Sequence, residues 1–181
     1  YSHSTPLLIG LAIGAYGLTQ ALLQIPFGML SDRIGRKKVI YLGLILFALG
    51  SLLAAMADSI YTVIVGRLLQ GSGAIAAVVM ALTADLTRDQ HRTKAMAAIG
   101  ISIGLSFSVA LASGAALESW IGLDGLFWAT ALMAIFGMLV LHWWVPTPYK
   151  HKQHQDMKPA RAQIGEVLAN TSIMRLVASI L

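Results

Sequence analysis

Long apolar runs constrain this sequence more than any other feature, because most of its residues lie in stretches of membrane-spanning length. A helix rises about 1.5 Å per residue, so about 20 apolar residues cross the ~30 Å hydrocarbon core of a bilayer. Backbone groups inside that core must bond to one another, which favours helices. We place five runs, at residues 6–30, 39–57, 60–86, 95–117 and 125–145. The sequence therefore predicts an all-α membrane protein.

The charged residues are few, and their positions predict how the chain is oriented. They make up 12% of the sequence, whereas a soluble domain has about 25%. Lys and Arg number four at 32–38, three at 88–94 and four at 149–161, but none at 118–124 or beside Asp58. Positive loops stay in the cytoplasm, so these basic loops are predicted to be cytoplasmic. The net charge of +5 reflects this topology, and we expect no nucleic-acid partner.

The sequence divides into three parts. Residues 1–146 hold the five apolar runs, and residues 147–171 are predicted to form a polar, basic cytoplasmic linker with a short amphipathic segment. Residues 172–181 begin another apolar run. Because the sequence opens without Met and stops inside this run, we expect it to be a piece of a longer protein.

A basic segment joins the first two runs and carries a recognisable motif. Residues 28–38 read Gly-Met-Leu-Ser-Asp-Arg-Ile-Gly-Arg-Lys-Lys. This order resembles the signature loop of the major facilitator superfamily, which follows that family's second transmembrane helix. The matching residues are Gly28, Asp32, Arg33, Gly35, Arg36, Lys37 and Lys38. The resemblance implies a partial major facilitator superfamily fold, namely the N-terminal six-helix bundle without its first transmembrane helix.

Among the residues of the apolar runs, Arg67 has the highest free-energy cost of insertion into a membrane. It lies about seven residues, hence ~10 Å, inside its run, where an unpaired charge costs at least a few kcal/mol. It can either extend outward to the membrane surface or face protein and water. Arg67 and Gln70 begin the order Arg-Leu-Leu-Gln-Gly-Ser-Gly, which resembles the family's fourth-helix motif. The resemblance implies a role for Arg67 in proton coupling.

One face of the first run is polar. Tyr16, Gln20 and Gln24 recur every four residues, so they share a helix face. They can bond to neighbouring helices or border a solvated cavity. The runs that begin at Tyr16 and Gln24 resemble the drug/proton antiporter branch of the superfamily. The fifth-helix signature of that branch contains Gly-Pro, whereas Ala115 follows Gly114 here.

Three charges are predicted to form a latch at the cytoplasmic side. Asp85 ends a run, where the helix dipole disfavours a negative charge, so a cation should offset it. Arg36 is the natural partner, because helices two and four are neighbours in this family. Asp32 would join them and, as in relatives, meet a helix of the opposite half. The alternative is that Asp32 only makes a turn and that the basic residues serve topology and lipid headgroups.

A faint internal repeat links the first and fourth runs. Gly10 and Gly14 are spaced as Gly100 and Gly104 are, and this spacing favours close helix packing. With one helix preceding the chain, these become helices two and five of a three-plus-three inverted repeat.

Taken with the resemblance, these patterns predict a secondary active transporter rather than an enzyme. We expect proton-coupled efflux of a small solute or drug by alternating access, in a bacterial inner membrane. The expected partners are the lipid bilayer, the solute and a second six-helix half; the proton is the coupling ion, with no cofactor and no metal. The alternative is a non-transporting membrane sensor or scaffold on the same fold.

The loop charges lead to a topology prediction. Cysteines introduced singly at Lys37, His91 and Lys152 should react with a membrane-impermeant maleimide only from the cytoplasmic side. Cysteines at Ser59 and Gly122 should react only from outside. The sequence contains no cysteine of its own, so it adds no background labelling. Labelling of position 37 from outside would reverse the predicted orientation.

Overall fold

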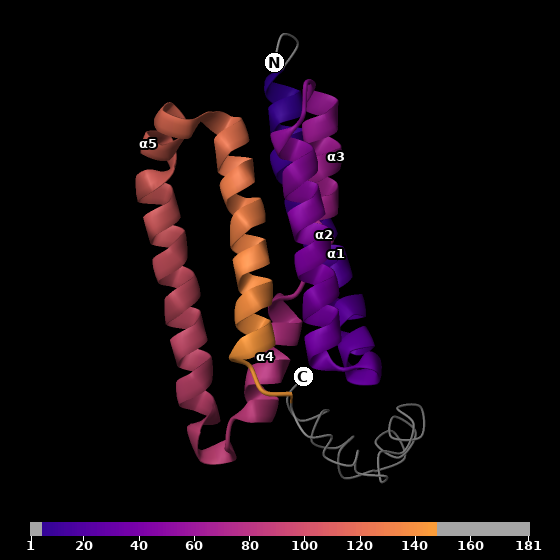
Figure 1. Ribbon diagram of the computed structural model, residues 1–181, viewed down its shortest axis with the longest axis vertical. Helices are drawn as coiled ribbons and strands as arrows, with labels where there is room; N and C mark the ends of the chain where they lie inside the picture. The colour runs from indigo at the N-terminus through magenta and orange to yellow at the C-terminus, as the bar shows by residue number, and fades with distance from the viewer. Residues whose placement is uncertain (1–4, 148–181) are drawn as a thin grey trace, which may run out of the picture. The chain divides into compact units, whose positions relative to one another are not determined.

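The structure, a computed structural model, describes residues 5–147, and every regular element in that part of the chain is helical. The elements are α1 Pro6–Ile34, α2 Arg36–Ala55, α3 Ile60–Gly71, α4 Ala76–Leu86 and α5 Asp89–Trp143 (Figure 1). The predicted start of a further run at 172–181 and all but the first residue of the predicted linker at 147–171 lie outside the described residues.

The signature segment is almost entirely helical, which differs from the predicted loop. Helix α1 continues through Pro26 to Ile34, and α2 begins at Arg36. Only Gly35 separates them, with φ 104° and ψ 141°. Side chains with a Cβ rarely adopt such a φ, so glycine is the residue that permits this one-residue joint. The prediction of a tight turn holds, but the charged residues on both sides belong to helices.

The third apolar run is one membrane span but two helices. Helix α3 ends at Gly71 and α4 begins at Ala76. Glycine is a poor helix former, and here tertiary packing adds to that weakness. A Cβ on Gly73 would collide with the carbonyl oxygen of Gly43 on α2, so the backbones touch at the break. The run at 60–86 is a candidate membrane span, as predicted, and its helix is interrupted between Gly71 and Ala76.

Helix α5 consists of two limbs that meet at Gly122. This residue has φ 71° and ψ 173°, and the chain reverses direction there (Figure 1). We call residues 89–121 the first limb and residues 123–143 the second limb. The reversal falls within the predicted acidic turn at 118–124, although the helical limbs extend further into it than predicted.

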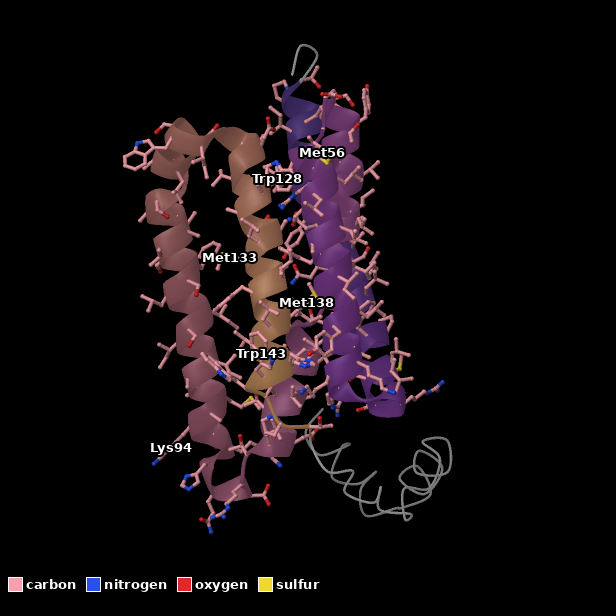
Figure 2. All side chains as sticks on the ribbon, in the orientation of Figure 1. Met56, Lys94, Trp128, Met133, Met138 and Trp143 are labelled. Carbon is pink, nitrogen blue, oxygen red and sulfur yellow. The ribbon has the colours of Figure 1, made fainter. Side chains whose placement is uncertain are left out.

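Helix α2 lies at the centre of the packing. It packs against α3 and α5, while α1 packs mainly on α3. One core cluster joins Phe27 of α1, Val39 of α2, Val78 of α4 and Leu141 of the second limb. The first limb contributes little, since residues 100–112 are all exposed, and its side chains extend freely above Lys94 (Figure 2).

Glycines bring α2 and α3 into backbone contact. A Cβ on Gly50 would lie 2.6 Å from the carbonyl oxygen of Gly66 and 2.8 Å from Cα of Gln70. A Cβ on Gly66 would lie 2.9 Å from the backbone nitrogen of Ala54. Small residues at such crossings let two membrane helices pack by dispersion forces. The sequence predicted packing at other glycines, on the first and fourth runs, and did not identify Gly50 and Gly66.

This contact predicts opposite effects for two alanine substitutions. Gly50→Ala should lower the stability of the full-length protein by about 1–3 kcal/mol, because the added methyl overlaps the α3 backbone. Gly17→Ala is the control, since a Cβ there meets nothing within 4 Å. It should be neutral or stabilise by up to about 1 kcal/mol. Thermal unfolding of the purified variants measures both, and an unchanged Gly50→Ala would contradict the close contact.

Candidate functional site

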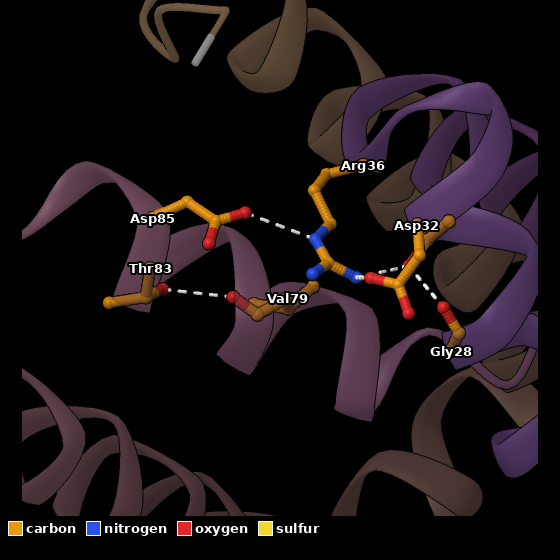
Figure 3. A network of polar contacts seen from close by, with 7 residues as sticks. Gly28, Asp32, Arg36, Val79, Thr83 and Asp85 are labelled. Atoms are coloured by element: carbon orange, nitrogen blue, oxygen red, sulfur yellow. Dashed lines mark hydrogen bonds and ion pairs between the residues drawn. The ribbon is translucent and has the colours of Figure 1, made fainter. Parts of the chain in front are cut away.

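Three helices meet in a charged cluster, which we define as Asp32, Arg36, Asp85 and Ser31. The Arg36 guanidinium lies 2.6 Å from an Asp32 carboxylate oxygen through Nη1 and 3.1 Å from an Asp85 oxygen through Nε (Figure 3). Nη1 also donates to the Ser31 hydroxyl at 2.6 Å. That hydroxyl donates in turn to the Gly28 carbonyl at 2.6 Å. Arg36 thus links α1, α2 and α4.

The cluster compensates three charges that the helix dipoles disfavour. Asp32 and Asp85 stand in the last turns of α1 and α4, where a negative charge is unfavourable. Arg36 is the first residue of α2, where a positive charge is unfavourable. Arg36 therefore stabilises both carboxylates, and each carboxylate stabilises Arg36. The side chains are 56%, 43% and 19% exposed respectively, so water still reaches both carboxylates.

Other residues of the signature segment have different surroundings. Lys37 donates from Nζ to the Val145 carbonyl at 2.7 Å, just beyond the second limb of α5. One turn further along α2, the Tyr41 hydroxyl lies 3.3 Å from Nδ1 of His142, which is three residues before Val145. These contacts fix the start of α2 to the end of α5. Arg33 and Lys38 are exposed, and Gly28 supplies the carbonyl that Ser31 uses.

Arg67 belongs to a buried chain of hydrogen bonds, which we call the polar chain. Its Nη1 donates to Oε1 of Gln70 at 2.7 Å, and Nε2 of Gln70 donates to the Ser51 hydroxyl at 2.6 Å. The hydroxyl donates to the Phe47 carbonyl at 2.8 Å. Gln70 is 1% exposed and Ser51 is 0% exposed. The guanidinium carbon also lies 4.6 Å from the ring centre of Tyr16, a cation–π distance.

The contacts of Arg67 show which way its side chain points. Extension to the nearer end of the span would carry the guanidinium toward the start of α3 at Ile60. Instead it bonds Gln70, one turn closer to the break in the span, and covers Tyr16 of α1. Within residues 5–147 its recorded partners are neutral, since the ion pairs there involve other residues.

The predicted polar face of α1 borders a cavity of about 370 Å³. Tyr16 and Gln20 line it, together with α2, the break between α3 and α4, and the second limb of α5. Gln24 does not line it. The same Tyr16 side chain thus contacts Arg67 and the cavity.

The predicted packing glycines have no packing partner in the described part of the chain. A Cβ built on Gly10, Gly14, Gly100 or Gly104 would meet nothing within 4 Å. Their role in close helix packing remains a prediction.

Comparison with known sequences establishes the family. Residues 1–181 match the sequence model of the Major Facilitator Superfamily. The chain belongs to this superfamily. Its fold class and the resemblance seen in the signature segment are thereby confirmed.

The superfamily member YajR of Escherichia coli (strain K12), an inner membrane transport protein, is 52% identical over 169 residues. The match covers 93% of this chain and 37% of YajR. The class B tetracycline resistance protein of Escherichia coli is 34% identical over 137 residues, which cover 75% of this chain and 34% of that protein. This chain therefore spans well under half the length of these relatives.

A solved structure supports the fold. The crystal structure of the peptide transporter POT superposes with a TM-score of 0.62 at 20% identity, covering 96% of this chain and 38% of that one. With four candidate membrane spans in the described residues, the chain is a multi-pass membrane protein of this family.

The charged cluster leads to a double-mutant prediction. Arg36→Ala and Asp85→Ala should each destabilise the full-length protein, and the two effects should be coupled by about 0.5–1 kcal/mol because the pair is half-exposed. The matched control pair is Arg92 and Asp89, which lie 2.9 Å apart on one exposed helix turn. Its coupling should be smaller. If the effects of Arg36→Ala and Asp85→Ala on stability are strictly additive, the contact contributes no interaction energy, and the charges of this segment serve only membrane topology.

Proposed function

We propose that these residues form part of the N-terminal half of a secondary active transporter in the bacterial inner membrane. It exports a small solute or drug by alternating access and uses protons as the driving ions. The observation that carries the proposal is Arg67, a cation held at depth between a neutral amide and an aromatic ring, beside a cavity.

The neutral surroundings of Arg67 give it capacity for an anion. A guanidinium has five N–H donors, and the polar chain uses one of them. A charge buried in a membrane is expensive unless it is paired, so its retention favours a functional role. A carboxylate brought beside Arg67, from the solute or from a segment outside residues 5–147, would pair with it.

Such a pairing can couple proton movement to solute movement. A nearby fixed positive charge stabilises the ionised form of a carboxylate and therefore favours proton release. When the solute or a conformational change draws that carboxylate away, its affinity for a proton rises. Arg67 would thus control the proton without carrying it.

The charged cluster serves as the latch of the same cycle. Alternating access moves one half of the protein against the other around a central site. Ion pairs that water can reach separate and re-form at low cost, because surface pairs contribute only about 0–1 kcal/mol each. The ion pairs of the cluster join α1, α2 and α4 of one half, so the latch also needs the Asp32 carboxylate, which is 56% exposed, to meet a helix of the opposite half.

The direction of transport has support from one relative. The class B tetracycline resistance protein is named for resistance to a drug, which is consistent with export. YajR bears a transport name without a solute. We leave the sensor or scaffold alternative as the outcome in which the purified wild-type protein moves neither solute nor protons.

Arg67 substitutions test the proposal. In proteoliposomes of the full-length protein, Arg67→Ala should abolish solute-dependent proton flux, measured with a panel of drugs that includes tetracycline. Arg67→Lys keeps the charge but loses the planar fork, so it should be partly active.

Arg92→Ala is the control, because Arg92 is 51% exposed and its ion pair within residues 5–147 is with Asp89 on its own helix turn. It should leave the flux near the wild-type level. Wild-type flux from Arg67→Ala would show that Arg67 has no part in coupling.

A further inference from the structure

We infer that Ser51 is a positioning residue, which holds the Arg67 guanidinium in place through the Gln70 amide. The relevance of Ser51 to transport rests on the proposed function. Its positioning of Arg67 rests on the hydrogen bonds of the polar chain alone. Ser51 lies on α2, 16 positions before Arg67 in the sequence, and is linked to it through Gln70.

The direction of every hydrogen bond in the polar chain is fixed by its two ends. Arg67 can only donate, so the Gln70 atom that faces it must be the carbonyl oxygen. The amide nitrogen of Gln70 then faces Ser51, whose hydroxyl must accept. The Phe47 carbonyl can only accept, so the Ser51 proton lies there. No member can reverse without breaking its neighbours' bonds.

Burial makes Ser51 the acceptor on which the amide depends. Gln70 is the largest fully buried side chain among residues 5–147, and the glycine contact between Gly50 and Gly66 brings α2 close enough for a short side chain to reach it. Within residues 5–147 no buried side-chain nitrogen or oxygen lacks a partner. Removing the Ser51 hydroxyl would leave the Gln70 amide nitrogen with a buried, unmatched donor, which is unfavourable.

Loss of the Ser51 hydroxyl would also affect Arg67, because the same Gln70 amide bonds both residues. Without Ser51 the amide gains by turning toward another acceptor, and its carbonyl then leaves the guanidinium. Arg67 would lose the Gln70 oxygen as a hydrogen-bond acceptor and, with it, its fixed position over Tyr16. Thus a hydroxyl on α2 determines where a charge on α3 stands relative to the cavity that Tyr16 lines.

A comparison within the chain separates this role from ordinary serine packing. Ser102 also donates to the carbonyl four residues earlier, at 2.8 Å to Ala98. Among the side chains of residues 5–147, none is recorded as a donor to its hydroxyl. Ser102→Ala is therefore a matched control, which removes the same backbone contact without touching the polar chain.

The test reads the Arg67 side chain directly. Full-length protein with ¹⁵N-labelled arginine is placed in lipid nanodiscs, and the Arg67 signal is identified by its loss in Arg67→Lys. Ser51→Ala should raise the hydrogen-exchange rate of the Arg67 guanidinium about tenfold, since a lost buried hydrogen bond shifts an equilibrium by about that factor. Ser102→Ala should leave it unchanged. Ser51→Cys, with a weak acceptor of similar size, should be intermediate and serves if the alanine variant folds poorly.

A second variant shows whether Ser51 acts through Gln70. Gln70→Met keeps the length of the side chain but removes its amide, so it should raise exchange to a similar level. Ser51→Ala should then add nothing in the Gln70→Met background. Full additivity of the two, or an Arg67 exchange rate within about twofold of wild type in both Ser51→Ala and Ser51→Cys, would overturn the inference.

Proton flux with tetracycline as the probe solute separates this inference from the proposed function. Altered exchange together with reduced flux in Ser51→Ala supports both. Altered exchange in Ser51→Ala, together with no proton flux from the wild-type protein, keeps Ser51 as the positioning residue and removes the transport proposal. Normal exchange with normal flux in Ser51→Ala removes the positioning role alone.

Discussion

The structure depends on one constraint: a lipid environment offers a charge or a backbone group no partner other than the protein itself. Most residues of the spans meet this constraint by being apolar and helical. Arg36 and Arg67 meet it differently. Arg36 lies at an end of its helix and is surrounded by carboxylates, whereas Arg67 lies at depth and has an amide and an aromatic ring. The two sites therefore differ in how much a change in their contacts would cost.

Helix α2 connects these two sites. Its first residue, Arg36, joins the charged cluster, and its buried face carries Ser51 of the polar chain. Between these two residues, Gly43 packs against the backbone at the break in the third span, and Gly50 packs against the backbone of α3. The small residues of α2 make it the surface on which the candidate functional residues of the other helices are arranged.

The sequence predicted the features that depend on local physics. The spans follow from apolar length, and the pairing of Arg36 with Asp85 followed from a negative charge at a helix end and the family resemblance. The structure shows that contact; its role in transport remains a prediction. Features that depend on contacts between distant residues were missed. Ser51 is a polar residue in an apolar span, and its role is visible from its hydrogen bond with Gln70 on α3, which the sequence does not predict. The break after Gly71 likewise reflects packing on Gly43, although the glycine cluster was a visible signal.

Because only Gly35 joins α1 to α2, the number of residues in the signature segment sets the rotation of α2 relative to α1 as well as the distance between them. Successive residues of a helix are turned by about 100° around its axis. With no loop to absorb a change, one residue added or removed between Ile34 and Arg36 would turn the start of α2 relative to α1 by that angle. Arg36 would then face away from both aspartates, and Lys37 would leave the Val145 carbonyl. The fixed count of residues in this segment therefore sets the angular register between two membrane helices.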